Sequence, residues 1–413
     1  MVPNGWSNES LKDICSKTIS YGIVQTGENL ESGVPCVRVV DLSKNTLNPI
    51  DMIKTSDEIH KSYKKTILCE GELMMALRGE IGLVKKVTSE LIGANITRGL
   101  ARLSPIKSVD SDYLLWTLRS NKIKNELARK SGGSALQEIA LGSLRKIVLP
   151  IPPLSEQRKI AKILSTWDKT ISTTEKLIET SKQQKKALMQ QLLTGKKRLV
   201  NPETGKVFQG EWGSKSPVSL FKLFSGFAFK STDAKDSGAK WLKIANVGIG
   251  EIKWDADSFL PEYFLSEHKK FVLTKGDIVV ALTRPTLGNR LKVARLTKDS
   301  DTSLLNQRVA KIVCKDNVDS EFIFQVLRSD QFAYRINVGL LGTDPPNLSI
   351  KVLEDFEILV PPYLEQQKIA SVLTVADKEI EVLETKLSHF KQEKKALMQQ
   401  LLTGKRRVVV DAA

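Results

Sequence analysis

The chain has 413 residues, with 63 Lys and Arg against 47 Asp and Glu, so its formal net charge is +16. A hydrophobic share of 41% without any run of eighteen apolar residues excludes a largely disordered chain and a transmembrane helix. We expect neither disulfides nor a metal site, because the chain has only four cysteines, without CxxC spacing, and three histidines. The start shows no secretory signal pattern, which predicts a cytoplasmic protein. The positive charge suggests a polyanionic partner.

Residues 1–151 read as a compact α+β domain. Short β-type runs at Val37–Val40 and Leu73–Leu77, bounded by Gly, Pro and Asp, alternate with a helical stretch at 112–130. The segments after these strands carry side chains suited to nucleic acid, because Arg and Asn can pair with base edges and Lys with phosphate. The candidates in this domain are Arg78, Lys85, Lys86, Asn95 and Arg98.

Residues 152–199 predict one long helix. The segment opens after Pro152-Pro153, and Gly195, followed by basic residues, predicts its end. Apolar residues recur in steps of four and three, which is typical of a coiled coil. The candidates for helix pairing are Ile160, Leu164, Trp167, Ile171, Ile178, Leu188 and Leu192.

Residues 200–360 predict a second α+β domain. It has β-type runs at Ile278–Leu282 and Val309–Val313 and a helical stretch at 320–335. Two of its loops again combine cations with amides. The nucleic-acid candidates here are Arg284, Asn289, Arg290, Lys292, Asn306, Gln307 and Arg308.

Residues 361–407 repeat the first helical segment, and 408–413 form a tail. At an offset of 209 residues, 27 of 47 positions are identical, and KKALMQQLLTGK recurs unchanged at 185–196 and 394–405. The two α+β regions are more faintly alike, so the chain is a duplicated domain with an internal pseudo-twofold repeat. The pairing candidates of this second helix are Ile369, Leu373, Ala376, Ile380, Leu383, Leu387, Phe390, Leu397 and Leu401.

Two long amphipathic helices in one chain can cover each other's apolar stripe. Because the first leaves one globular domain and ends at the other, where the second begins, pairing requires an antiparallel coiled coil. The alternative is that each helix packs separately on its own domain. The charge favours a special role for these helices, since residues 156–199 and 365–408 together hold +10 of the +16.

Catalytic motifs are weak in this sequence. TDPPN at 343–347 resembles the loop that holds a flipped adenine in amino-methyltransferases, but Asn347 stands where the stacking aromatic would be. TGK occurs three times without the upstream glycine of a P-loop. We therefore expect no catalytic residue and no metal site in this chain.

Taken together, the two blocks PPLSEQRKIAKIL…KKALMQQLLTGKKR and PPYLEQQKIASVL…KKALMQQLLTGKRR resemble the specificity subunit of Type I restriction–modification systems. The resemblance covers essentially the whole chain. GTDPPNLS at 342–349 also resembles a turn that ends a target-recognition domain in that family, whereas the first copy, GGSALQEIALGSL at 132–144, lacks the Asn and both prolines.

The resemblance implies a sequence-specific DNA-recognition subunit without catalysis of its own. Each variable domain would read one half of a bipartite, asymmetric double-stranded DNA target, while the paired helices set the spacing and dock two modification subunits. The complex, joined by restriction subunits, would use S-adenosylmethionine, ATP and Mg²⁺ through those other subunits. This chain would bind no cofactor and no membrane.

Two other functions are compatible with the residues. A self-contained methyltransferase with fused recognition domains would bind S-adenosylmethionine without partners. A coiled-coil scaffold would use its positive charge on membranes or chromosomes without choosing a sequence. Preference for one split DNA site would distinguish the DNA-recognition subunit from the scaffold. Binding of S-adenosylmethionine by the isolated chain would instead indicate the methyltransferase.

Overall fold

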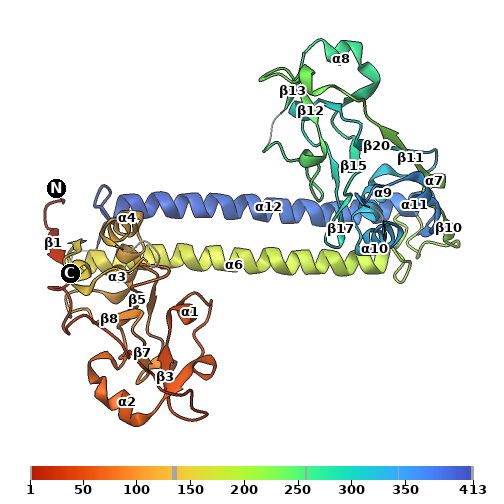
Figure 1. The fold of residues 1–413 in the computed structure, drawn as a ribbon. Coiled ribbons are helices and arrows are strands. Elements are labelled where there is room, and N and C mark those ends of the chain that lie inside the picture. Colours follow the sequence, from red (N-terminus) through yellow and green to blue (C-terminus); the bar gives the residue numbers. More distant parts are fainter. Residues whose placement is uncertain (1, 133–136, 256–257, 343, 411–413) are drawn as a thin grey trace. The chain divides into compact units, whose positions relative to one another are not determined.

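The computed structural model describes residues 2–132, 137–255, 258–342 and 344–410. The described residues form two compact units, 1–176 with 385–413 and 177–384. Each unit contains one α+β domain and one half of each of two long helices, α6 (Leu154–Leu192) and α12 (Tyr363–Leu401) (Figure 1).

The first domain is built from two small sheets around a common core, with short helices beside them. Its main sheet has the antiparallel order β2-β8-β5-β6, its second sheet the order β4-β3-β7, and β1 pairs with β9. The strands are β1 (Ser7–Ser10), β2 (Ser20–Tyr21), β3 (Val34–Val37), β4 (Ile53–Thr55), β5 (Leu73–Ala76), β6 (Val84–Lys86), β7 (Asn95–Ile96), β8 (Leu100–Leu103) and β9 (Val148–Ile151). The helices are α1 (Val39–Leu42), α2 (Asp57–Ser62), α3 (Ser111–Leu118), α4 (Asn121–Lys130) and α5 (Leu141–Arg145).

The second domain repeats this topology. Its main sheet has the order β11-β20-β15-β18, its second sheet the order β13-β12-β19-β14, β10 pairs with β21, and β16 with β17 forms an additional hairpin. The strands are β10 (Gly213–Lys215), β11 (Phe221–Ser225), β12 (Ala239–Leu242), β13 (Phe259–Leu260), β14 (Val272–Leu273), β15 (Ile278–Ala281), β16 (Thr286–Leu287), β17 (Arg290–Leu291), β18 (Val293–Arg295), β19 (Ser303–Leu305), β20 (Val309–Cys314) and β21 (Ile358–Val360). The helices are α7 (Pro217–Leu220), α8 (Phe264–Glu267), α9 (Ser320–Leu327), α10 (Asp330–Gly339) and α11 (Ile350–Glu354).

Two local predictions are corrected by the structure. The expected strand at Val37–Val40 ends at Val37, because the Asp41 carboxylate accepts from the Arg38 backbone N–H at 3.0 Å and turns the chain into α1. The helical stretches 112–130 and 320–335 are each two helices. The second helix of each pair starts anew at a serine, Ser120 or Ser329, whose hydroxyl caps it.

The halves of α6 and α12 pair antiparallel within each unit. In the first unit the rings of Trp167 and Phe390 meet edge to face at 5.8 Å, and Lys391 pairs with Glu175 at 2.7 Å. In the second unit Lys182 pairs with Glu384 at 2.6 Å. The helix-pairing candidates are all buried or half-buried, whereas Leu177, beside Ile178, is exposed. The apolar stripe therefore faces the neighbouring helix in both units.

A repeated charged contact lies in each helix pair. Lys394 binds Asp168 in the first unit, and Lys185 binds Asp377 at 2.6 Å in the second, at equivalent positions of the duplication. Arg328 adds bonds of 2.7 and 3.1 Å to Asp377. Burial raises the pKa of Asp377, but Arg328 and Lys185 outweigh it and hold that pKa at about 2. The carboxylate is therefore charged at neutral pH and fixes the helix register.

A second repeated contact closes the end of each helix pair. Glu365 is fully buried and accepts two bonds of 2.7 Å from Arg198 and one of 3.1 Å from the Trp212 indole N–H. Glu156 accepts equivalent bonds from Arg407 and from the Trp6 indole N–H. In the first unit this contact joins the N-terminal segment, through Trp6, to the C-terminal segment, through Arg407. In the second unit Arg198 and Trp212 both lie in the single segment that connects α6 to β10.

Candidate nucleic-acid interface

In each domain, the main sheet brings the two candidate loops together. In the first domain β5 pairs with β8, and the Leu77 N–H donates to the Gly99 carbonyl at 2.8 Å, so the loops of Arg78 and Arg98 are neighbours. In the second, β15 pairs with β20 and the Leu282 N–H donates to the Arg308 carbonyl at 2.9 Å. Segments that are separate in sequence thus form one surface at the same end of each sheet.

The candidate cations of the first domain differ in their exposure and in whether their side chains are already bound within the protein. Arg98 is exposed and Arg78 is half-buried, and no side-chain hydrogen bond or ion pair holds either within the described residues. Lys86 is bound to both carboxylate oxygens of Asp112 at 2.9 Å. Lys85 donates to the Lys44 carbonyl, and burial lowers its pKa. Arg78 and Arg98 are therefore the stronger candidates for contact with a ligand.

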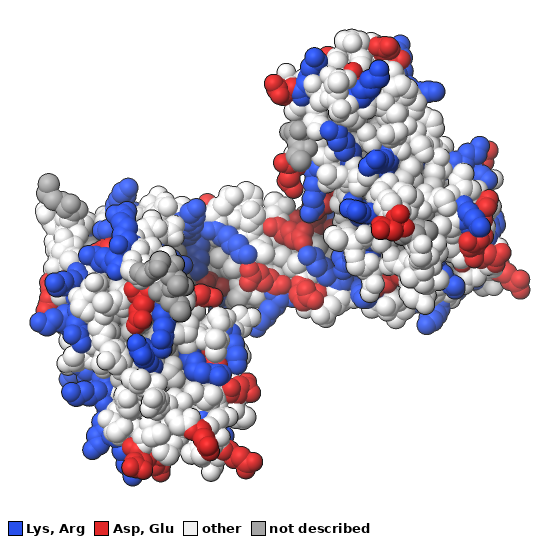
Figure 2. All heavy atoms as spheres, in the orientation of Figure 1, with Lys and Arg blue, Asp and Glu red and all other residues white. Residues whose placement is uncertain are grey.

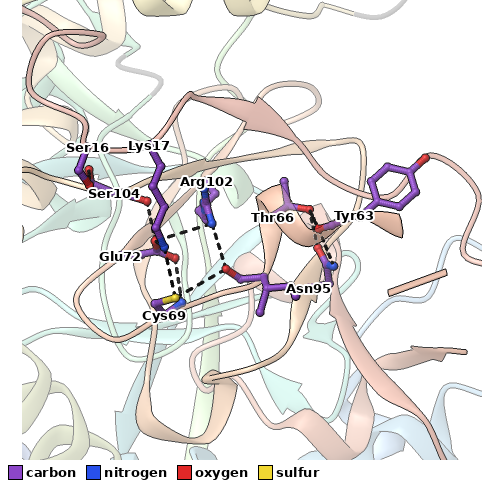
Figure 3. A network of polar contacts seen from close by, with 10 residues as sticks. Ser16, Lys17, Tyr63, Thr66, Cys69, Glu72, Asn95, Arg102 and Ser104 are labelled. Carbon is purple, nitrogen blue, oxygen red and sulfur yellow. Dashed lines mark hydrogen bonds and ion pairs between the residues drawn. The ribbon is translucent and has the colours of Figure 1, made fainter. Parts of the chain in front are cut away.

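Asn95 does not belong to this surface. Its side chain is fully buried, and its Oδ1 accepts from the Thr66 hydroxyl at 2.7 Å and from the Ile96 N–H at 2.9 Å. Its Nδ2 donates to the Tyr63 carbonyl at 3.4 Å (Figure 3). Asn95 lies on β7, which pairs with β3 in parallel, and both residues of this strand are buried. The predicted contact with DNA is therefore corrected to a structural role.

A buried ion network lies at the opposite end of the main sheet, where β5 begins and β8 ends. Glu72 is buried and binds Lys17 at 3.0 Å, the Ser104 hydroxyl at 2.5 Å and the Cys69 N–H at 2.8 Å, with Arg102 at 3.9 Å (Figure 3). The bond to Glu72 raises the pKa of Lys17. Each charge in this cluster has an opposite charge beside it, so the arrangement fixes the chain.

Arg284 stands out in the second domain. Its φ is +49°, a left-handed conformation that is unfavourable for any residue other than glycine. The equivalent position in the first domain is Gly79, with φ +69°. Its N–H donates to the Pro346 carbonyl at 2.8 Å, and the neighbouring Thr283 hydroxyl donates to Asn347 at 2.7 Å. These contacts hold a strained residue whose guanidinium is exposed and, among the described residues, unpaired.

The other candidates of the second domain lie on the hairpin β16–β17 and on the turn before β20. Asn289, Arg290, Gln307 and Arg308 are exposed. Asn306 is half-buried and accepts from the Arg308 N–H at 3.1 Å. Lys292 is half-buried, and burial lowers its pKa. The hairpin tip and the turn therefore present two guanidinium groups, of Arg290 and Arg308, and two exposed amides, of Asn289 and Gln307.

Sequence reasoning missed the two buried Glu–Arg–Trp contacts and the two Lys–Asp contacts. A signal for them was present, because Glu156 and Glu365 follow the Pro-Pro pairs at the same offset, and Arg198 and Arg407 end the two blocks. The partners lie far apart along the chain, so the repeat alone could not pair them. No cluster of three metal-ligating side chains occurs in the described part of the chain, and no helix there is apolar and long enough to cross a membrane.

Comparison with known proteins agrees with the repeat. The family model described as "Type I restriction modification DNA specificity domain" matches twice, at residues 3–183 and 210–392. The chain is 35% identical over 308 residues to the MjaVIII specificity subunit of Methanocaldococcus jannaschii, covering 73% of this chain and 72% of that protein. It is 23% identical over 390 residues to the EcoKI specificity subunit of Escherichia coli, covering 89% and 81%.

Solved structures confirm the predicted fold. The S subunit of a Type I restriction–modification system from M. genitalium matches with a TM-score of 0.60 at 15% identity, covering 97% of this chain and 98% of that one. The HsdS subunit from Thermoanaerobacter tengcongensis matches with a TM-score of 0.51 at 16% identity, covering 98% of both. At this identity the likeness speaks for the fold alone.

Proposed function

Because the chain belongs to the family of Type I restriction–modification DNA specificity proteins, we propose that each of its two α+β domains reads one half of a split, asymmetric DNA target. The observation that carries the proposal is the recurrence of one arrangement in both domains. Two loops meet at the end of the main sheet and present arginines whose side chains have no partner among the described residues, Arg78 and Arg98 in one domain and Arg284 and Arg308 in the other.

Arginine is suited to this task because its guanidinium can bind guanine O6 and N7 with two hydrogen bonds. The strained backbone of Arg284 supports its role, since the first domain relieves the same turn with Gly79. Differences in loop sequence on a shared scaffold allow the two domains to read different half-sites. The fused arrangement also raises the effective concentration of the second domain once the first is bound.

The paired halves of α6 and α12 are proposed to set the distance between half-sites and to dock two modification subunits. Their repeated ion pairs and buried stripes support the role of a rigid spacer. Catalysis, S-adenosylmethionine, ATP and Mg²⁺ would then belong to the modification and restriction subunits. This chain would be the reader and scaffold of the complex.

Selection from a pool of random duplexes tests the function. The chain, purified together with its modification subunits, is expected to enrich one split sequence with an unconstrained gap of constant length. Equal enrichment of all duplexes would contradict sequence reading and favour a general polyanion-binding scaffold. Calorimetry with S-adenosylmethionine on the chain alone is expected to show no binding, and a saturable heat would favour the fused methyltransferase.

Replacing Arg284 should impair one half-site only. Arg284→Gly removes the guanidinium and relieves the left-handed strain, so the protein should fold with its stability preserved. Binding to the selected target is expected to weaken by about 1–3 kcal/mol, with relaxed preference at a single position of one half-site. Binding measured on targets mutated in either half checks this.

The matched control is Arg78→Ala in the first domain, which should relax the other half-site. If Arg284→Gly instead weakens binding equally on every sequence, Arg284 contacts phosphate and does not read a base.

A further inference from the structure

A groove in the first unit carries charge that the protein itself does not neutralise. It has a volume of about 910 Å³ and lies between the β5–β6 turn, the start of α4 and the C-terminal part of α12. Apolar side chains, among them Ile81, Leu83 and Met398, line its base. On the face drawn in Figure 2, Lys and Arg side chains gather where Figure 1 shows α4 and the end of α12.

Four lysines of this groove have no acidic partner among the described residues. Lys122, Lys124, Lys395 and Lys405 are exposed, and none of them forms an ion pair within the described residues. Glu80 is the one carboxylate in the described lining. Four positive charges around a concave surface attract an anion more strongly than they would on a convex one, because low-dielectric walls focus the field.

Three further cations of the groove are already engaged, and one of them, Lys391, pairs with Glu175 at 2.7 Å. Lys394 binds Asp168 and lies 4.3 Å from the centre of the Trp116 ring. The Arg119 guanidinium donates to the Val84 carbonyl at 3.0 Å and lies 5.2 Å from the same ring. These contacts hold the base in place, so the free lysines stand on a fixed frame.

The second copy of the fold shows what the groove lacks. Lys395 corresponds to Lys186 at the offset of 209, and Asn121 corresponds to Asp330. In the second unit Asp330 binds Lys186 at 2.8 Å, so that unit supplies its own anion. Lys122 and Lys124 correspond to Gln331 and Ala333. The first copy therefore keeps an anion-binding position open that the second copy has filled with a carboxylate.

We propose that this groove binds backbone phosphates of the DNA next to the half-site read by the first domain, an inference that rests on the proposed function. Continuity with the reading loops favours DNA as the occupant. The part of the β5–β6 turn that forms one wall of the groove, Glu80–Leu83, directly follows Arg78 and Gly79 in the same turn. A duplex whose base edges meet Arg78 thus has its backbone beside the groove. Lysines provide mobile point charges suited to phosphate, together with the amides of Asn121 and Gln399.

The duplication offers a specific test, Asn121→Asp, which places the second copy's carboxylate in the first groove. Asp is favourable in the first turn of a helix, so the fold should be kept. Affinity for a fluorescent random-sequence duplex is measured against salt concentration with the full chain in its complex. Each lost phosphate contact lowers the slope of log K against log salt by about 0.9. We expect a loss of one to two contacts, with affinity at low salt reduced on the order of fivefold.

Asp330→Asn is the matched control, because it breaks the equivalent ion pair in the second unit without touching the groove. It should leave the slope unchanged or increase it. Lys395→Gln should reproduce the effect of Asn121→Asp. An unchanged slope in both groove variants, with thermal unfolding as in the unmodified protein, would overturn the proposal.

Two other outcomes separate the groove from the proposed function. If the groove variants weaken assembly with the modification subunits and leave the salt slope unchanged, the groove binds a protein and our inference is wrong. If the unmodified complex enriches no split sequence, the proposed reading function fails, whereas the groove can still be assessed by its salt slope. If the complex prefers one target and the groove variants bind DNA as the unmodified protein does, the proposed phosphate binding in the groove is wrong and the proposed reading function stands.

Discussion

Inserting one heptad into both long helices is expected to lengthen the preferred gap between the two half-sites by about three base pairs. Seven helical residues add about 10.5 Å, and each base pair rises about 3.4 Å. The insertions belong between Lys176 and Leu177 in α6 and between Glu384 and Thr385 in α12, where the two compact units divide. A seven-residue insertion keeps the apolar stripe in phase, so the contacts within each unit are retained.

The effect on the original target should be large. A complex whose half-sites no longer fit the spacing keeps only one specific half, and binding should fall on the order of 10³-fold toward the non-specific level. Selection from random duplexes measures the new gap directly. Insertion into α6 alone is the control, because it cannot keep Glu175–Lys391 and Lys182–Glu384 in register together and should impair folding. An unchanged gap in the double insertion would show that the helices do not set the spacing.

Replacing Glu156 by Gln should loosen both ends of the chain at once. Glu156 is buried and binds Trp6, near the start, and Arg407, near the end. Hydrogen bonds to a charged group contribute about 1.5–3 kcal/mol, so the first unit should unfold several degrees earlier. The terminal segments then keep the pairing of β1 with β9, the Arg407 bond to the Asn4 carbonyl and their packing, but lose their shared buried charge. Hydrogen exchange should accelerate at residues 2–10 and 402–410.

Glu365→Gln is the matched variant in the second unit. It removes the same kind of contact with Arg198 and Trp212, but these residues belong to one continuous connection between α6 and β10. Since the covalent chain keeps them near each other, local exchange should change less than in Glu156→Gln. Equal exchange in the two variants would mean that packing around Leu401 and Leu402 holds the ends of the first unit without help from Glu156.

The helices were the most predictable part of the molecule. Heptad spacing and the Pro-Pro and Gly boundaries predicted two helices, and the structure has them at Leu154–Leu192 and Tyr363–Leu401. Periodicity works there because the same face of each helix is buried along its length, against the other helix and, near its start, against a domain core as well. It failed at 112–130 and 320–335. There Ser120 and Ser329 interrupt an apolar pattern that continues through both helices of each pair.

The candidate interface was less predictable. Residue type selected Arg78 and Arg284 together with Asn95, and nothing in the local sequence separated them. Burial separates them, since Asn95 lies on a covered parallel strand while Arg284 is exposed on a turn. Whether a residue near a loop is buried or exposed depends on how its strand pairs within the sheets. These strand pairs join segments that are distant in sequence.

The duplication, the two long helices and the family could be predicted from the amino-acid sequence, because they are properties of order and spacing along the chain. The excess of positive charge on the helical segments was also visible in it. Which charges are neutralised depends on the folded arrangement of the chain. Lys86, Lys185 and Lys186 are bound to carboxylates, whereas Lys122 and Lys395 are unpaired among the described residues. A charge is available to a ligand only when folding has brought no opposite charge to it, and that is settled by contacts between segments far apart in the chain.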